Sequence, residues 1–150
     1  MKKILNKNIT IIALTFLIPG IIAFITRDSF SSYKMLIKPK LSPPGILFPI
    51  VWNILYLLMS ISVIMVKDND ENNLKIYYIQ LILNALWSPI FFVLKSYLLA
   101  LIELILLLIT VLFVFYKFYK ENKVSGYLLI PYIIWIIYAL YLNYFVFLYN

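Results

Sequence analysis

Apolar residues form five long runs separated by short polar segments, at residues 9–25, 46–66, 76–94, 97–116 and 127–149. The runs are 17 to 23 residues long, and Glu103 is the only charged residue inside them. A helix rises about 1.5 Å per residue, so about 20 apolar residues cross the roughly 30 Å hydrocarbon core of a bilayer. A membrane-crossing strand needs only about 9–11 residues of alternating polarity. The pattern therefore predicts an all-α integral membrane protein, a bundle of five transmembrane helices.

The segments between the runs predict a single five-helix domain over residues 1–150. Runs three and four are separated only by Lys95 and Ser96, which predicts a tight antiparallel hairpin. The segment 26–45 is the longest connection, and it contains many apolar residues as well as Pro43 and Pro44. Connections of this length are often lids or binding segments. The alternative is a segment that rests at the membrane interface.

Composition sharpens the class of protein. The chain is 65% hydrophobic and 13% charged. Soluble domains average roughly 45–50% apolar residues and about 25% charged residues. It has no Cys and no His, which excludes disulfides and thiolate metal sites and removes the commonest general base and metal ligand. We therefore expect no metal site and no protein-bound cofactor. The remaining candidates for chemistry are aromatic rings, amides and one carboxylate.

The distribution of positive charge predicts the orientation. Eight basic residues lie on the side of the N-terminus and five on the opposite side. Basic residues near helix ends favour the cytoplasm, so we expect a multi-pass protein of the cell membrane with a cytoplasmic N-terminus. The start of the chain resembles a secretory signal, but no small-residue cleavage site follows Ile25, and we expect the first helix to be retained. The net charge of +7 is spread over both sides, which does not indicate nucleic-acid binding.

Polar and aromatic residues inside the predicted helices fall on stripes, because residues three, four and seven apart share a helix face. One stripe contains Gln80, Asn84, Trp87 and Phe91; a second contains Tyr132, Trp135, Ala139, Leu142 and Asn143; a third contains Phe48, Trp52, Tyr56 and Met59. Such stripes indicate a flat cavity for a planar apolar ligand. Alternatively, the amides join helices and the aromatic residues form interfacial belts. For Glu103 we expect a bond to a hydroxyl or amide of a neighbouring helix, with a proton relay as the alternative.

Three segments resemble the TspO/translocator-protein family, also known as tryptophan-rich sensory proteins. They are 41–56 (LSPPGILFPIVWNILY), 80–92 (QLILNALWSPIFF) and 131–135 (PYIIW), the last followed by Ala139, Leu142 and Asn143. Glu103 also falls where the family has an acidic residue. The motifs occur in the family's order, and the resemblance extends over essentially the whole chain.

The resemblance implies a five-helix bundle, usually a homodimer, whose members bind porphyrins such as protoporphyrin IX and synthetic benzodiazepine ligands. Some bacterial members degrade protoporphyrin in light, which would make Trp52 and Trp135 photochemical residues here. The residues that the resemblance and the stripes together place at the ligand are Trp52, Asn84, Trp87, Phe91, Trp135, Ala139, Leu142, Tyr56 and Gln80, with Pro43 and Pro44 at the rim.

The chain departs from the family pattern at Leu41 and Ile46, where the family often has tryptophans, and it has no complete sterol-recognition pattern. Without His or Cys, a porphyrin would be held by stacking and amide contacts rather than through a metal. The basic residues that could meet its propionates are Arg27, Lys34, Lys38 and Lys40. Two other functions stay open: a proton-coupled transporter that uses Glu103, and a membrane scaffold without a ligand. The sequence leaves open whether the protein is an enzyme.

Overall fold

The computed structural model describes residues 2–150, and in this range the chain forms helices and turns without any strand. The elements in chain order are α1 (Lys2–Thr26), the 3-10 helix η1 (Arg27–Met35), α2 (Leu47–Val66), α3 (Asn72–Ser88), the π-helical turn η2 (Pro89–Val93), α4 (Tyr97–Glu121), α5 (Lys123–Tyr127) and α6 (Ile130–Tyr149). Five helical stretches are long and apolar enough to cross a membrane. The prediction of an all-α protein with five membrane-spanning helices is confirmed.

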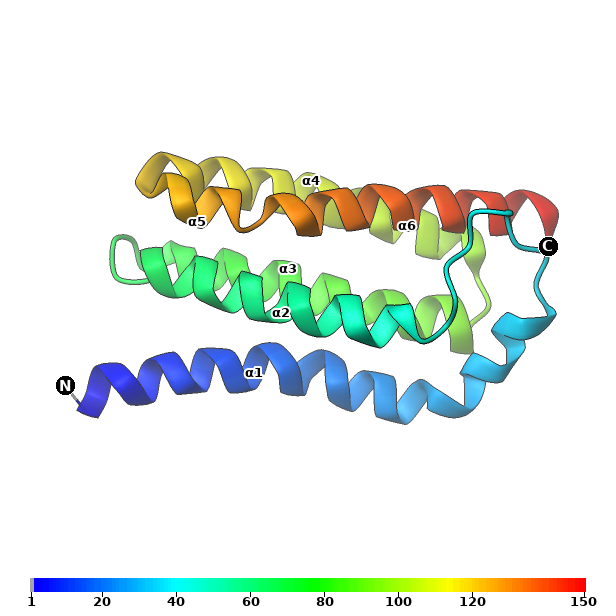
Figure 1. Ribbon diagram of the computed structural model, residues 1–150, viewed down its shortest axis with the longest axis horizontal. Coiled ribbons are helices and arrows are strands. Elements are labelled where there is room, and N and C mark those ends of the chain that lie inside the picture. Colours follow the sequence, from blue (N-terminus) through cyan, green and yellow to red (C-terminus); the bar gives the residue numbers. More distant parts are fainter. Residues whose placement is uncertain (1) are drawn as a thin grey trace.

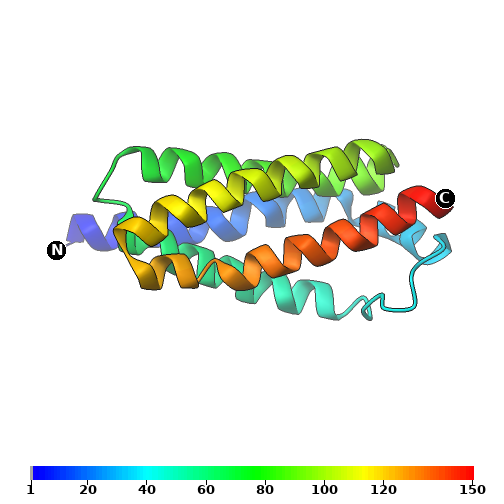
Figure 2. The same cartoon turned by 90° about the horizontal axis from the view of Figure 1, so that it is seen from above.

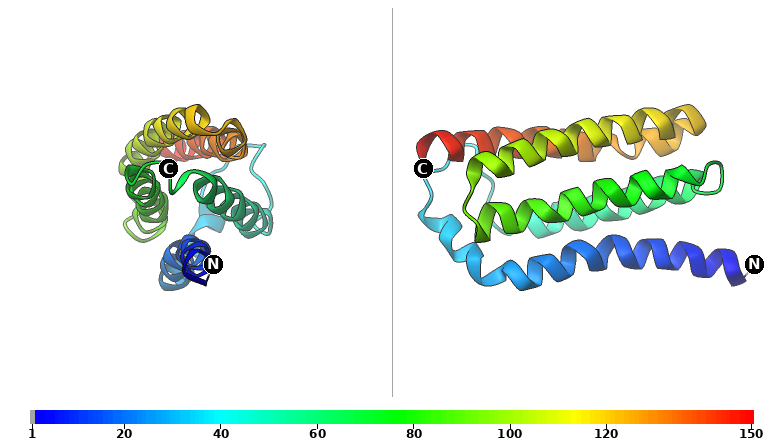
Figure 3. Two further views of the ribbon diagram at one scale, coloured as in Figure 1. Left: turned by 90° about the vertical axis from the view of Figure 1, so that its left-hand side faces the viewer. Right: turned by 180° about the vertical axis from the view of Figure 1, so that it is seen from behind.

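The long helices lie side by side and alternate in direction (Figure 1). The N-terminus, the α2–α3 turn and α5 lie at one end of the bundle, and η1, the α3–α4 turn and the C-terminus lie at the other. The two views of Figure 3 place α1 at the edge of the bundle, where it packs against α3 and α2. Figure 2 shows α4 and α6 running alongside each other from the turn at α5, and these two helices form the most extensive pair contact.

The core is apolar, and so is most of the outer surface. Met59, Val63, Leu81 and Leu107 are fully buried or nearly so. The outer face of α4 exposes large apolar side chains, among them Ile109. Water would penalise such a surface, whereas lipid chains do not. The burial pattern therefore agrees with a bundle that is surrounded by a bilayer.

Helix α4 extends to Glu121, beyond the predicted end of its run at residue 116. Lys117 and Lys120 are polar but are good helix formers, so they continue the helix past the apolar run. The break comes at Asn122, which has an extended backbone. Its side-chain oxygen accepts hydrogen bonds from the backbone N–H groups of Val124 (2.9 Å) and Ser125 (3.2 Å), and so caps α5. The first and third helices likewise begin earlier than predicted, with polar first turns.

The fifth apolar run is divided into α5 and α6, with a break just before Pro131. Proline is well tolerated in a first helical turn, because a backbone N–H at that position would have no partner within the helix. Gly126 allows α5 to approach α4 closely: a Cβ atom at this position would lie 2.6 Å from Tyr119 Cβ. The long connection 26–45 also differs from the prediction, because its first nine residues after Thr26 form the helix η1.

Candidate ligand-binding site

A chain of hydrogen bonds crosses the interior between α2, α3 and α6. The Tyr56 hydroxyl donates to Asn84 Oδ1 (3.2 Å), Asn84 Nδ2 donates to the Tyr132 hydroxyl oxygen (3.0 Å), and the Tyr132 hydroxyl donates to Gln80 Oε1 (3.0 Å). Gln80, Asn84 and Tyr132 are buried. Polar groups in an apolar interior are costly unless they are paired. The network therefore joins three helices and leaves one N–H of the Asn84 amide for another partner.

Aromatic rings lie next to this network. Trp52 stacks on Tyr56 with ring centroids 5.4 Å apart, and its ring meets Trp135 edge-on at 6.4 Å. Trp135 also contacts Phe48 edge-on at 6.0 Å. These residues come from α2 and α6, so the predicted stripes on the two helices do face each other.

The rings and Asn84 line a cavity of about 30 Å³ inside the bundle. Its lining residues are Phe48, Trp52, Asn84, Trp87, Leu104, Leu107, Trp135, Ile136 and Ala139. All three tryptophans of the chain are among them. This volume is far below that of a small-molecule site, because the rings pack against one another.

The sequence model of the TspO/MBR family matches residues 10–148 of this chain. The chain belongs to the TspO/MBR family. It is 34% identical over 118 residues to the tryptophan-rich protein TspO of Chlorobaculum tepidum, with 75% of each chain covered. It is 36% identical over 118 residues to protein CrtK of Rhodobacter capsulatus, with 75% of this chain and 74% of that protein covered. The tryptophan-rich protein TspO of Archaeoglobus fulgidus is 35% identical over 133 residues, which cover 85% of this chain and 86% of that one.

This TspO/MBR protein is therefore a multi-pass membrane protein, and its predicted site residues fall into three groups. Trp52, Asn84, Trp87, Trp135 and Ala139 line the cavity. Tyr56 and Gln80 belong to the hydrogen-bond network beside it, and Phe91 stacks on Trp87 at 4.8 Å. The remaining three do not reach the cavity lining: Leu142 is buried elsewhere on α6, and Pro43 and Pro44 lie in the segment before α2.

Several residues of the site were absent from the predicted set. Phe48, Leu104, Leu107 and Ile136 also line the cavity. The predicted stripe of α2 includes Phe48, whereas the predicted ligand-binding residues do not. Asn143 positions Trp87 without lining the cavity, since its Oδ1 accepts the indole N–H at 3.0 Å.

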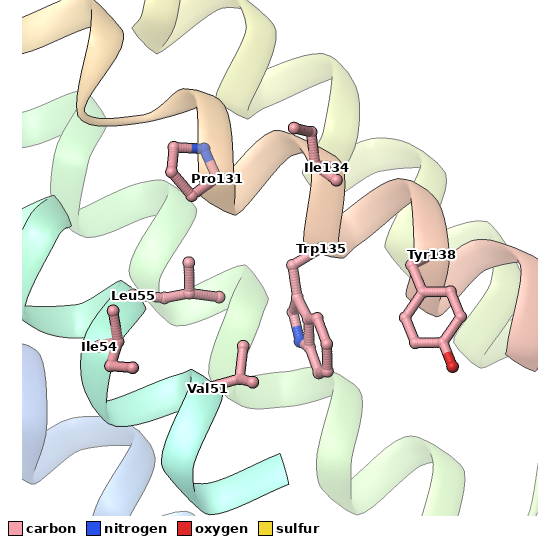
Figure 4. Close-up of a pocket in the computed structure, with 7 residues that line it drawn as sticks. All are labelled: Val51, Ile54, Leu55, Pro131, Ile134, Trp135 and Tyr138. Atoms are coloured by element: carbon pink, nitrogen blue, oxygen red, sulfur yellow. The ribbon is translucent and has the colours of Figure 1, made fainter. Parts of the chain in front are cut away.

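A larger groove opens on the outside of the bundle, between α2 and α6 (Figure 4). Its volume is about 420 Å³, and its lining residues are Val51, Ile54, Leu55, Pro131, Ile134, Trp135 and Tyr138. Trp135 is the one residue that lines both this groove and the internal cavity. The indole is thus a wall between them.

Hydrogen bonds join the segment 36–46, which follows η1, to Tyr138 on α6 and to Asn150 just after α6. The Asn150 side chain accepts a hydrogen bond from Ile37 N (2.9 Å) and donates one to the Ile37 carbonyl oxygen (3.1 Å). The Tyr138 hydroxyl donates to the Leu41 carbonyl oxygen. These bonds hold the segment across the end of the bundle that carries the C-terminus (Figure 1).

The four basic residues predicted to meet propionates all lie on η1 or this segment. Arg27 sits 4.3 Å from the centre of the Phe24 ring, and Lys38 Nζ sits 4.6 Å from the centre of the Tyr33 ring. Lys34 and Lys40 are exposed. The cation–π contact leaves the N–H donors of Lys38 able to bind an anion, whereas Arg27 already pairs with Asp28, with Nε 3.7 Å from Oδ1.

Glu103 differs from the expectation. It is buried on α4, yet neither carboxyl oxygen has a hydrogen-bond partner among the described residues. The expected bond to a neighbouring hydroxyl or amide is wrong. The amides and hydroxyls on α3 and α6 instead bond to one another, in the network of Asn84, Tyr132 and Gln80.

Proposed function

We propose that this protein binds a porphyrin, protoporphyrin IX or a related flat apolar tetrapyrrole, inside the helix bundle, and acts in tetrapyrrole sensing, transport or light-dependent degradation. The observation that carries the proposal is the convergence of all three tryptophans on one cavity bordered by Asn84. A tetrapyrrole is a large apolar plate, and aromatic faces stack on such plates. The names of its relatives, tryptophan-rich sensory protein and translocator protein homolog, support a sensory or translocator role.

Binding requires the cavity to expand. Sites for ligands of this size occupy roughly 300–1,000 Å³, far more than the cavity of about 30 Å³. Phe48, Trp52 and Trp135 meet one another through edge contacts. Separating these rings breaks no hydrogen bond between them, so a ligand can replace their mutual contacts with its own faces.

Polar groups of the ligand also find partners. The remaining N–H of the Asn84 amide can donate to a ring nitrogen or a carbonyl oxygen. Lys34 and Lys40 are exposed on the segment that crosses the end of the bundle, where they can pair with propionates. The site thus offers stacking inside the membrane and positive charge at its border.

A titration with protoporphyrin IX in the dark tests the proposal. We expect saturable quenching of tryptophan emission by the full chain in nanodiscs, with one porphyrin per site. In a matched control, all three tryptophans are replaced by Phe and one is placed on the lipid-facing surface by Ile105→Trp, since Ile105 is exposed. This control reports partition into lipid alone. Equal quenching of both proteins would contradict the proposal and favour a scaffold without a ligand.

Light-dependent chemistry is tested separately. Replacing Trp52 and Trp135 by Phe is expected to slow the loss of bound protoporphyrin under illumination while the fold is kept. Trp87→Phe is the matched control, because Trp87 lines the same cavity but is held by Asn143. Equal decay in the parent and in the double variant would remove the case for tryptophan photochemistry.

The transporter function is favoured by one observation, the buried carboxyl of Glu103 that has no partner among residues 4–150. A proton-coupled exporter would need this group. Full substrate flux in liposomes that carry Glu103→Gln would exclude that function and leave the porphyrin proposal untouched.

A further inference from the structure

We propose that the groove between α2 and α6 is a lateral passage through which a flat apolar ligand moves between the bilayer and the internal cavity, with the Trp135 indole as its gate. The inference rests on the proposed function, because it concerns the path of the ligand proposed there. It adds a route and a gating residue to the binding site itself.

The first support is the shared wall. The Trp135 side chain projects from α6 toward Val51 on α2, across the space between the two helices (Figure 4). The groove on one side has a volume of about 420 Å³, within the range of small-molecule sites. It is apolar and opens toward the lipid, where an apolar plate is concentrated. Rotation of one indole would connect this groove to the internal cavity.

The second support is that no hydrogen bond restrains the Trp135 side chain among the described residues. No residue in the described part of the chain accepts a hydrogen bond from its indole N–H, and its ring contacts are with Phe48, Trp52 and Tyr138. Trp87, in contrast, is held by its bond to Asn143. Of the two, only Trp135 can turn without leaving a bonded polar group unpaired.

The third support is the seam itself. Helix α6 packs extensively on α4 and only lightly on α2, and among residues 4–150 no side-chain hydrogen bond joins α2 directly to α6. Helix α2 is fastened instead to α5, at the opposite end from the segment that carries Leu41. There Ser62 Oγ donates to the Ser125 carbonyl oxygen and Ser125 Oγ donates to the Ser62 carbonyl oxygen, each at 2.8 Å. Tyr56 also bonds to Asn84 on α3, so α2 stays in place and the passage opens by rotation of the Trp135 side chain.

The competing route runs past the segment before α2, and that route is closed by polar contacts. Asn150 makes two hydrogen bonds to Ile37, and Tyr138 bonds to Leu41. Opening there would break these bonds, whereas rotation of the Trp135 indole at the α2–α6 seam breaks no hydrogen bond among the described residues.

The test blocks the groove with a removable group. The chain has no native cysteine, so Ile134→Cys can be modified alone with a bulky methanethiosulfonate reagent. Ile134 lines the groove but not the cavity, and it is exposed. Ile137→Cys is the matched control, since Ile137 is also exposed on α6 but does not line the groove. Rates of protoporphyrin IX binding and release are measured in nanodiscs before modification, after it, and after reduction.

Modification at Ile134→Cys is expected to slow binding and release by the same factor, tenfold or more, with the equilibrium affinity unchanged within twofold. Reduction should restore both rates, and the control should not change. Unchanged rates after complete modification would overturn the passage. Slower binding with an unchanged release rate would also overturn it, since the modified residue would then lie in the bound site. Absence of saturable binding before modification would instead refute the proposed function.

Discussion

The indole N–H of Trp87 donates a hydrogen bond to Asn143 Oδ1 at 3.0 Å, and Asn143 Nδ2 donates onward to the Tyr97 carbonyl oxygen at 2.8 Å. This pair fixes one wall of the cavity to the start of α4. The other two tryptophans are placed by ring contacts alone. One side of the site is therefore rigid, and the other can adapt to a ligand.

Asn143→Ala should destabilise the protein by about 1–3 kcal/mol, because it leaves the buried Trp87 N–H without a partner and removes the side-chain bond to the Tyr97 carbonyl. The unfolding free energy in detergent measures this. Asn53→Ala is the control, since Asn53 is exposed and bonds only within its own helix. Equal losses in the two variants would contradict the assigned role of Asn143.

Tyr132→Phe should cost more stability than Tyr56→Phe. The Tyr132 hydroxyl both accepts from Asn84 and donates to Gln80, so its removal leaves two buried groups unpaired. Tyr56 makes one bond, to Asn84. At about 1–3 kcal/mol per unpaired group, chemical unfolding should separate the two variants by about 1 kcal/mol or more. The reverse order would show that the network does not stabilise the fold as described.

Glu103→Leu should raise the free energy of unfolding by at least about 1 kcal/mol, because it removes a buried polar group without a partner in the described chain. Glu121→Leu is the matched control and should lower it, since Glu121 accepts a hydrogen bond from Asn73 Nδ2 at 2.7 Å. Thermal scans of both variants provide the comparison. A loss of stability in Glu103→Leu would reveal a stabilising partner for the carboxyl.

Gly126→Ala should destabilise the turn between α4 and α6 by about 1–3 kcal/mol. Its Cβ would lie 2.6 Å from Tyr119 Cβ and 2.8 Å from Tyr119 Cα, and neither atom can move without shifting α4. Gly20→Ala is the control: nothing lies within 4 Å of its Cβ position, and alanine favours a helix by about 0.5–1 kcal/mol. The melting temperature should fall for the first variant and rise for the second.

Acid should weaken the turn between α2 and α3. The hydrogen bond from Lys117 holds the pKa of Asp70 below its usual 3.8, with a further contribution from the backbone N–H of Asn72. A lowered pKa means that the carboxylate stabilises the fold above the usual Asp pKa and loses this contribution as the pH falls through the lowered value. The melting temperature of the parent should therefore drop below about pH 4.

Asp70→Asn should melt lower than the parent at pH 7 and show a smaller drop in acid. High salt should narrow the difference in melting temperature between the two proteins at pH 7. The ion pair of Lys117 and Asp70 is partly exposed, so salt screens it. Identical pH profiles for the two proteins would exclude a role for this carboxylate.

The sequence predicted what depends on the pattern along each helix. Run lengths predicted the five spans, and the spacing of Asn84 and Trp87 placed both on the face that lines the cavity. Lys117 was expected to lie in a polar loop, but polarity does not end a helix; the extended backbone at Asn122 does. The homodimer and the cytoplasmic N-terminus stay predictions.

The spacing of residues along each helix could not predict features that depend on how the helices are rotated relative to one another. The partners of Asn84 come from α2 and α6, and which hydroxyls reach its amide is decided by helix packing. The same packing leaves Glu103 without a bond. The size of the cavity depends on how Trp52 and Trp135 meet, which no periodicity encodes.

The arrangement of the tryptophans has a practical consequence. Because all three lie around one cavity, biosynthetic incorporation of 5-fluorotryptophan would give three fluorine resonances and no background signal from the rest of the bundle. Each indole would report separately on exchange. A mobile Trp135 and an anchored Trp87 should then be distinguishable by line width in a single spectrum.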